Sequence, residues 1–285
     1  MSPTVGGLLD EGSRALADAV ESRRDAQILL GHALGVSRAW LSAHGNDPAD
    51  PAPARVYREL VQRRRSGEPI AYLVGRREFY GLAFRVTPDV LIPREDTETL
   101  IDSALEKLPP HAAADVLDLG TGSGCVAIAI AYERPAARVT AVDVSAAALN
   151  VARGNAEACG VSVDFLQGSW FEGLTGRQFD LIVSNPPYVA SGDSHLLQGD
   201  LRFEPPLALA SGQNGLADIR LIVAGTPAFL RPGGWLLFEH GHDQAGASRD
   251  LLLDTGFSEI FHRIDIAGLA RVAGGRLLTS KSSSR

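Results

Sequence analysis

The 285-residue sequence has few cysteines, no excess of basic residues and no long apolar run, and each shortage argues against a class of protein. Cys125 and Cys159 stand too far apart for a zinc-ligand pair, so we expect two reduced thiols and no metal site. A formal charge of -7 argues against a protein whose main role is nonspecific binding to duplex nucleic acid. Charged residues interrupt the segment from Asp10 to Arg24, where a signal peptide would be apolar, and no run reaches transmembrane length. We therefore expect a cytoplasmic protein without membrane association.

The remaining composition, 45% hydrophobic and 21% charged residues, is that of a soluble globular protein with a large and a small domain. From Leu8 to about Gly67 apolar residues recur at intervals of three and four, which predicts helices, with a proline-rich loop at residues 45–53. Alternation about Gly81 in residues 78–86 predicts a β-hairpin. We expect a helical domain at residues 1–75, a hairpin linker at 76–92, a large domain at 93–280 and a disordered tail at 281–285.

Strands and helices alternate in the large domain, which predicts an α/β fold with a doubly wound, mostly parallel sheet. A further helix at about residues 97–108 leads into it. The strands are expected at residues 115–119, 138–142, 162–166, 179–184, 234–239, 258–265 and 270–279, and the helices at 124–133, 145–159, 216–230 and 244–254.

The loop Asn185-Pro186-Pro187-Tyr188 directly follows the apolar strand at residues 179–184. Proline cannot continue a strand ladder and forces the residue before it into extended geometry, so Asn185 must lie in a fixed loop beyond the strand end. Open α/β sheets bind their ligands at this edge. The loop is suited to present an amide and a ring to a planar nitrogen substrate, although an ordinary strand-ending turn would have the same pattern.

A second strand end carries the glycine-rich turn Gly120-Thr121-Gly122-Ser123-Gly124, followed by a helix. Glycines let backbone amides approach a ligand closely, and a helix N-terminus favours anions, which indicates a nucleotide-like ligand. Cys125 stands where a dinucleotide fingerprint would have its third glycine, and no P-loop Gly-Lys-Ser or Gly-Lys-Thr follows. Asp143 ends the next strand, where a carboxylate can bind ribose hydroxyls or, alternatively, cap a helix before Ser145.

Two other clusters admit competing interpretations. Seven arginines lie between Arg55 and Arg77 against two acids, which fits a solvated helix end better than a contact to RNA or an acidic protein. Glu239-His240-Gly241-His242-Asp243 resembles a metal-binding cluster, but no further ligand set is spaced to join it, so we expect no metal there.

Taken together, the glycine turn, Asp143 and the Asn185 loop resemble a class I, Rossmann-like S-adenosylmethionine-dependent methyltransferase. Additional motifs resemble the peptide chain release factor glutamine N5-methyltransferase family over most of the chain. These motifs are Arg77-Glu-Phe-Tyr-Gly81, Leu91-Ile-Pro-Arg94 with Thr97-Glu98, Phe203-Glu-Pro205, and Glu239-His-Gly241 before Gln244.

This resemblance implies that S-adenosylmethionine is the cofactor and that the glutamine of the Gly-Gly-Gln motif in class I release factors is the substrate. It implies that residues 120–124 surround the methionine moiety, Asp143 binds the ribose and Trp170 flanks the adenine. It further implies that Asn185, Pro186, Pro187 and Tyr188 hold the glutamine side chain, and that the protein is a monomer with no need for nucleic acid. Ser169 stands where the family commonly has Asp, and Leu269-Ala270 replaces residues that are more often polar.

A glutamine amide nitrogen is a poor nucleophile, because its lone pair is delocalised into the carbonyl. We hypothesise that the Asn185 side-chain oxygen and the Pro186 carbonyl accept its two hydrogens and aim the nitrogen at the methyl group. An adenine or other exocyclic-amine methyltransferase of nucleic acids is an alternative, although it usually has an extended basic groove. A noncatalytic S-adenosylmethionine-binding protein associated with translation is a second alternative.

Overall fold

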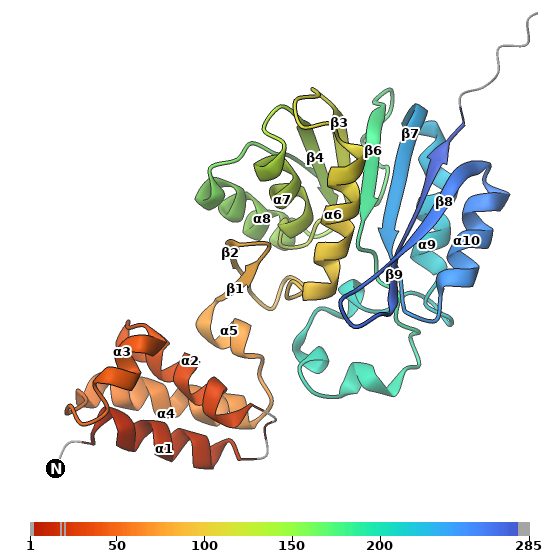
Figure 1. The fold of residues 1–285 in the computed structure, drawn as a ribbon. Coiled ribbons are helices and arrows are strands. Elements are labelled where there is room, and N and C mark those ends of the chain that lie inside the picture. Colours follow the sequence, from red (N-terminus) through yellow and green to blue (C-terminus); the bar gives the residue numbers. More distant parts are fainter. Residues whose placement is uncertain (1–2, 18, 20, 279–285) are drawn as a thin grey trace, which may run out of the picture. The chain divides into compact units, whose positions relative to one another are not determined.

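A helical unit and a sheet-containing unit make up the computed structural model, which describes residues 3–17, 19 and 21–278 (Figure 1). The helical unit comprises residues 1–76 and 198–203, and the sheet unit comprises residues 77–197 and 204–285. The tail predicted at residues 281–285 lies outside the described residues. None of the described helices has the length and apolar character needed to span a membrane.

The helical unit is built around a core of leucines from several helices and the ring of Tyr57. A Cβ on Gly12 would lie 1.8 Å from the Tyr57 hydroxyl oxygen, so the glycine makes room for the ring. Side-chain oxygens of Thr4 and Ser37 cap two of the helices, and Gly35 in left-handed geometry ends a third. The helices are α1 (Val5–Ala15), α2 (Ser22–Leu34), α3 (Arg38–Ala43), α4 (Pro51–Arg65) and α5 (Ile70–Val74).

The loop predicted at residues 45–53 ends earlier than expected. Helix α4 begins at Pro51, so Pro51 and Pro53 belong to its first turn. Proline is tolerated there because the first amides of a helix have no intrahelical partner, and its fixed φ already suits the helix. The prediction was therefore wrong at the C-terminal boundary of the loop.

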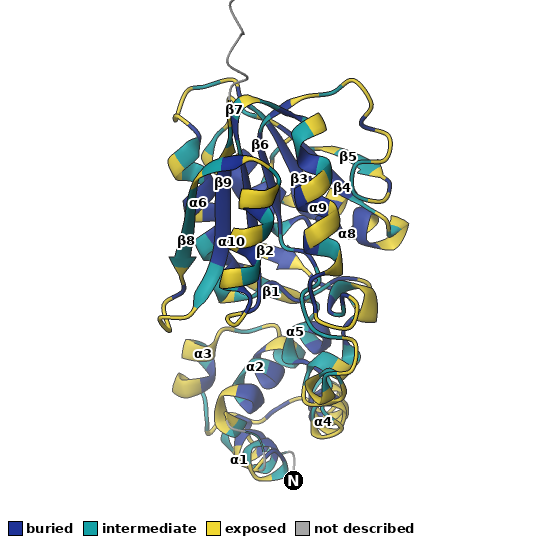
Figure 2. Ribbon diagram, turned by 90° about the vertical axis from the view of Figure 1, so that its right-hand side faces the viewer, coloured by how far each residue is buried: buried dark blue, intermediate teal, exposed yellow. Residues whose placement is uncertain are grey.

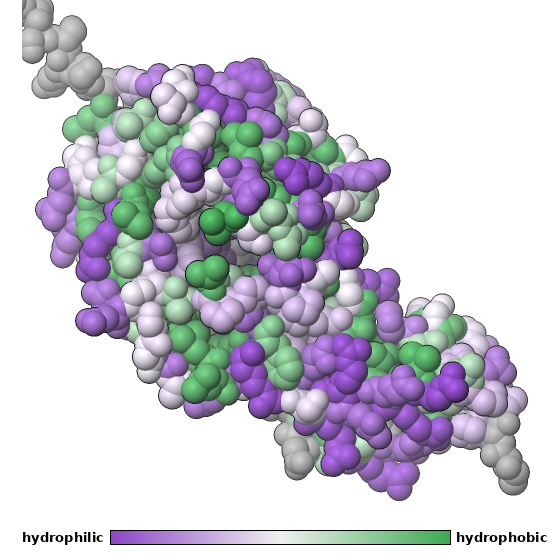
Figure 3. Space-filling model, turned by 180° about the vertical axis from the view of Figure 1, so that it is seen from behind, coloured by the Kyte–Doolittle hydropathy of each residue, from purple (hydrophilic) through white to green (hydrophobic). Residues whose placement is uncertain are grey.

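The segment 198–203 packs within the helical unit although it lies far along the chain. Arg64 donates from Nε to Asp25 at 2.8 Å and from Nη1 to Asp200 at 2.9 Å, and Arg202 donates to the Ser66 carbonyl. Arg58 pairs with a carboxylate of the same unit as well. Several arginines of the cluster between Arg55 and Arg77 therefore form ion pairs within the helical unit. The face of this unit that Figure 3 shows is largely hydrophilic.

The sheet unit contains a large sheet of seven strands in the order β5-β4-β3-β6-β7-β9-β8. The first five are parallel, and β9 runs antiparallel to both of its neighbours. The sheet is therefore doubly wound and mostly parallel, as predicted. Its strands are β3 (Asp115–Leu119), β4 (Arg138–Asp143), β5 (Asp164–Gln167), β6 (Phe179–Ser184), β7 (Leu230–Glu239), β8 (Phe257–Ile264) and β9 (Ala270–Leu277).

Alternating side chains of these strands enter two separate cores. Leu181 and Val183 of β6 face the core formed with helices α6, α7 and α8, whereas Ile182 between them faces the core formed with α9 and α10. Both faces are covered, so most residues of the central strands β3, β4 and β6 are buried (Figure 2). The helices are α6 (Glu98–Lys107), α7 (Cys125–Glu133), α8 (Ala146–Cys159), α9 (Ala217–Gly225) and α10 (Ala245–Asp254), with short 3-10 turns η1 (Glu95–Thr97), η2 (Ser194–Leu197), η3 (Leu201–Phe203), η4 (Pro206–Ala208) and η5 (Thr226–Ala228).

The predicted hairpin consists of β1 (Arg76–Phe79) and β2 (Leu82–Arg85), joined by Tyr80 and Gly81 with φ of 50° and 70°. Phe79 and Phe84 are buried in the α6–α8 core. The helix predicted at residues 216–230 was too long, since α9 ends at Gly225. Pro227 follows closely and lacks the amide proton needed to continue the helix. Strand β7 begins at Leu230, four residues before the predicted start at Gly234.

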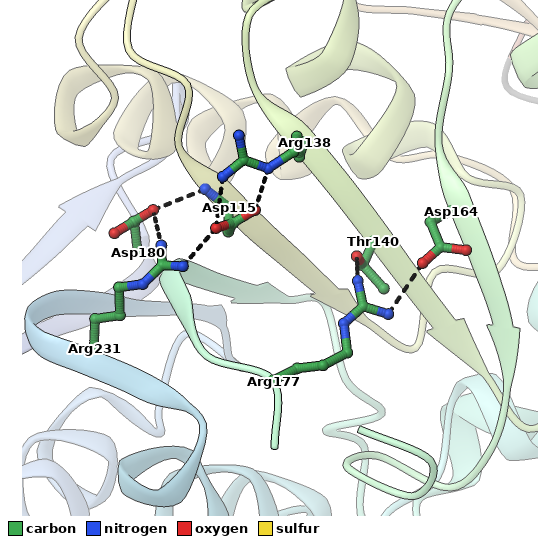
Figure 4. Close-up of polar contacts among 7 residues, drawn as sticks. All are labelled: Asp115, Arg138, Thr140, Asp164, Arg177, Asp180 and Arg231. Carbon is green, nitrogen blue, oxygen red and sulfur yellow. Dashed lines mark hydrogen bonds and ion pairs between the residues drawn. The ribbon is translucent and has the colours of Figure 1, made fainter. Parts of the chain in front are cut away.

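Ion pairs tie together the amino-terminal ends of four parallel strands (Figure 4). Asp115 on β3 accepts from Arg138 on β4 at 2.7 and 2.8 Å and from Arg231 on β7 at 2.6 Å. Arg231 also pairs with Asp180 on β6. Hydrogen bonds from Arg138 hold the pKa of Asp115 below its usual value. This network lies at the opposite end of the strands from the glycine turn and the Asn185 loop.

Candidate active site

A cavity of about 370 Å³ lies at the carboxyl ends of β3, β4 and β6, within the usual range of small-molecule sites. The glycine turn after β3, the end of β4, the segment around Trp170 and the Asn185 loop all contribute to its wall. The segment before α6 and the segment after Glu204 complete it. Of the sequence-predicted site residues, Gly120, Thr121, Gly122, Ser123, Asp143, Trp170, Asn185 and Pro187 line the cavity, whereas Gly124, Pro186 and Tyr188 are not among the residues that line it.

The glycine turn follows β3 with left-handed backbone geometry at Gly120 and Gly124. A Cβ on Gly120 would lie 3.3 Å from the ring of Trp170, so the missing side chain lets the indole pack against the turn. Gly124 caps α7 with φ of 83°, and a Cβ there would lie 2.8 Å from the Ile128 side chain. Gly124 therefore shapes the turn without touching the cavity.

Asp143 braces this turn from the end of β4. Its Oδ2 accepts from the Gly122 amide at 2.8 Å, and its Oδ1 accepts from the Ser145 amide at 2.8 Å. Ser145, and not Asp143, is the N-cap of α8, because its side chain accepts from the Ala148 amide. The carboxylate is thus held rigidly on the cavity wall.

Trp170 has an unusual backbone geometry for a non-glycine residue, with φ of 49°. Its ring packs against the core on the α9 and α10 side and borders the cavity. Ser169 also lines the cavity, and its amide donates to Glu172 Oε2 at 3.1 Å. The residue that replaces the family's usual Asp therefore lies on the wall itself.

Asp118, to which the sequence analysis gave no role, is a buried carboxyl on the cavity wall. Burial raises its pKa from 3.8 to about 7, although the hydrogen bond from Thr121 Oγ1 at 2.6 Å acts in the opposite direction. In the sequence, only the position of Asp118 just before the glycine turn could have marked it as a site residue. Its burial, which raises its pKa, could not be read from the sequence.

Asn185 is held by a chain of hydrogen bonds. Its Nδ2 donates to Thr97 Oγ1 at 3.0 Å, and Thr97 Oγ1 donates to Glu239 Oε2 at 2.7 Å. The Tyr188 hydroxyl donates to the other oxygen, Oε1, at 2.9 Å. Thr97 and Glu239 are each about 1% exposed, and burial raises the pKa of Glu239 while the two hydroxyl donors oppose that shift. Thr97 and Glu239 were recognised as motif residues but not as site residues.

The backbone after the two prolines is fixed by Gln244. Its Nε2 donates to the Tyr188 carbonyl at 3.0 Å, and its Oε1 accepts from the Gly241 amide at 2.9 Å. A Cβ on Gly215 would lie 2.1 Å from the same Tyr188 carbonyl, so glycine is required there. The loop is therefore rigid on both sides of its prolines.

The Glu239-to-Asp243 segment places His240 in the core, where its Nδ1 donates to the Gly241 carbonyl at 2.7 Å. Within the described residues, no three His, Cys, Asp or Glu side chains are grouped to hold a metal ion.

Arg94 is the one Arg or Lys among the described residues that line the cavity. Its guanidinium pairs with Glu204, whose buried Oε2 also accepts from the Ile92 amide at 3.0 Å. Pro205 lines the cavity next to it, whereas Phe203 belongs to the segment that packs in the helical unit. The Phe203-Glu-Pro motif thus contributes Pro205 to the wall, and Glu204 pairs with the lining residue Arg94.

Comparison with known proteins gives a consistent result. Residues 97–199 match the methyltransferase small domain family, and residues 7–75 match the PrmC N-terminal domain family. A release factor glutamine methyltransferase from Bordetella pertussis is 53% identical over 92% of this chain and 97% of its own length. The corresponding protein from Xylella fastidiosa is 52% identical over 89% and 93%. A T. thermophilus 16S rRNA methyltransferase in complex with AdoMet and guanosine shares the fold, with 22% identity and a TM-score of 0.55 over 71% of this chain and 49% of that one.

Proposed function

The chain belongs to the release factor glutamine methyltransferase family, and from this premise we propose that it methylates the side-chain nitrogen N5 of a glutamine in a release factor. The substrate glutamine is that of the Gly-Gly-Gln motif in class I factors. The observation that carries the proposal is the anchored amide of Asn185, which lies on the wall of the same cavity as the glycine turn.

The cavity fits S-adenosylmethionine as the methyl donor. The glycine turn and the Trp170 ring line the same cavity, and the missing side chain at Gly120 lets the indole pack beside the turn, which suits an adenosine ligand. Asp143 would bind the ribose, and Trp170 would flank the adenine. Asp118 and Arg94 also line the cavity. Asp118 would bind the ammonium group of the methionine part, and Arg94 would bind its carboxylate. When bound, the cofactor supplies an electrophilic methyl group on a positively charged sulfur.

Asn185 positions the nucleophile. With its nitrogen held by Thr97, its oxygen is free to accept one hydrogen of the glutamine amide, and the Pro186 carbonyl accepts the other. These contacts fix the nitrogen for an in-line attack, so that catalysis consists mainly of positioning and electrostatics. Pro187 stiffens the loop. Tyr188 supports it from behind through Glu239. The proton on nitrogen leaves to water after transfer.

The two units divide the work in this proposal. Residues 1–75 recognise the release factor, the hairpin at 76–92 joins the parts, and residues 93–280 carry out the reaction. The enzyme acts as a monomer in the cytoplasm and needs no nucleic acid.

A single assay with radiolabelled S-adenosylmethionine tests the proposal. The purified protein is offered a class I release factor, the same factor with the motif glutamine changed to alanine, and adenine-containing DNA and RNA. Label on the unchanged factor alone is the expected result. Label on nucleic acid would instead support an exocyclic-amine methyltransferase, and cofactor binding without any label would support a noncatalytic protein.

A further inference from the structure

The hydrogen-bond chain behind Asn185 has a fixed direction. Glu239 accepts from two hydroxyl groups, one on each carboxylate oxygen, those of Thr97 and Tyr188. A threonine hydroxyl has only one proton, and here that proton is directed to Glu239. The Thr97 oxygen can therefore only accept from Asn185.

This direction decides which end of the Asn185 amide faces the cavity. If the amide were turned over, its oxygen would face the Thr97 oxygen with no proton between them, and a buried acceptor pair of this kind is unfavourable. The nitrogen is thus kept toward Thr97, which is buried, and the oxygen is left for a ligand. An amide with its nitrogen in the cavity would present hydrogens to the hydrogens of the substrate amide.

We propose that Thr97 and Glu239 are positioning residues that select the reactive orientation of the Asn185 amide. The inference rests on the proposed role of Asn185 as the acceptor for the substrate amide. Neither residue needs to touch the reacting nitrogen. Thr97 lies at the start of α6 and Glu239 at the end of β7, so the orientation of Asn185 on the β6 loop depends on two distant parts of the chain.

Substitutions at Thr97 test the proposal most directly. Thr97→Val keeps the shape and removes the hydroxyl, so kcat should fall about 10- to 100-fold, as expected when one anchoring hydrogen bond is lost, while the Kd for S-adenosylmethionine stays within about twofold. Thr97→Ser retains the hydroxyl and should restore most of the activity. Thr226→Val is the matched control, because Thr226 is also fully buried and donates to the Ile222 carbonyl away from the cavity.

The second arm is a double-mutant cycle with Glu239→Gln. The glutamine amide can direct a proton at Thr97, whose own proton then turns toward Asn185 and favours the wrong orientation. The single change should therefore lower kcat, and the double variant with Thr97→Val should be no slower than Thr97→Val alone. Independent structural damage would instead multiply the two losses.

The outcomes separate this inference from the proposed function. Absence of label with the wild-type enzyme and a release factor overturns both. Normal labelling by wild type together with an undiminished kcat in Thr97→Val overturns the inference alone. Equal losses in Thr97→Val and the Thr226→Val control also overturn it, since they would assign the effect to general destabilisation.

Discussion

Replacing Asp118 with Asn should stabilise the cofactor-free protein at neutral and alkaline pH. Burial raises the pKa of Asp118 to about 7, whereas the unfolded chain has the ordinary value of 3.8. Between these values the folded protein holds a proton that the unfolded chain has released. The stability of the wild type therefore falls as the pH rises from about 4 to about 7, and it levels off above that.

The magnitude follows from the two pKa values. Ionising a carboxyl whose pKa is about 7 instead of 3.8 costs about 4 kcal/mol more in the folded state than in the unfolded state. Asn is neutral at every pH and keeps an oxygen for the Thr121 hydroxyl. The stability difference between D118N and wild type should grow by about 1.4 kcal/mol per pH unit and reach at most about 4 kcal/mol above pH 7.

Urea unfolding at several pH values between 4 and 9 measures this difference. The fluorescence of Trp170 and Trp235 reports on the sheet unit. Thr121→Val is an informative companion, because loss of its hydroxyl should raise the pKa of Asp118 further and extend the slope to higher pH. A constant offset between the D118N and wild-type curves, or a less stable D118N protein at pH 8, would refute the reasoning.

Three further predictions concern the site and the fold. Asn185→Ala should abolish methyl transfer to the release factor while cofactor affinity, measured by calorimetry, stays nearly unchanged; full activity would contradict its role. Desolvation lowers the pKa values of His240 and His262, so the folded protein favours their neutral forms. The wild type should therefore lose stability as the pH falls below about 6.5. Thermal unfolding should show a smaller loss of stability at low pH for His240→Gln than for wild type. Arg231→Ala should lower stability by about 1 kcal/mol, since the residue is partly exposed, with unchanged kcat; a loss of turnover would show that the strand-end network influences the site.

Local sequence signals predicted the architecture and much of the cavity wall. The apolar run before Asn185, the two prolines and the glycine spacing each act within a few residues, so their geometry could be inferred directly. The same reasoning failed at Pro51 and Pro227, where proline fits a first helical turn in one case and ends a helix in the other. Local pattern alone does not decide between these uses.

The support behind Asn185 depends on long-range contacts. Thr97 and Glu239 are 142 positions apart, and nothing near either residue announces the other. The high pKa of Asp118 likewise arises from burial by elements that fold around it. Motif recognition selected these positions, but their roles required the assembled sheet.

Residues 198–203 belong to the helical unit although they follow β6 in the chain. The chain passes from one compact unit to the other at residue 76, again at residue 197 and once more at residue 203. Asp200 and Arg202 of this segment contact Arg64 and Ser66 of the helical unit. A variant in which only residues 1–76 are exchanged for another sequence would therefore lose these contacts, and residues 198–203 would have to be exchanged with them.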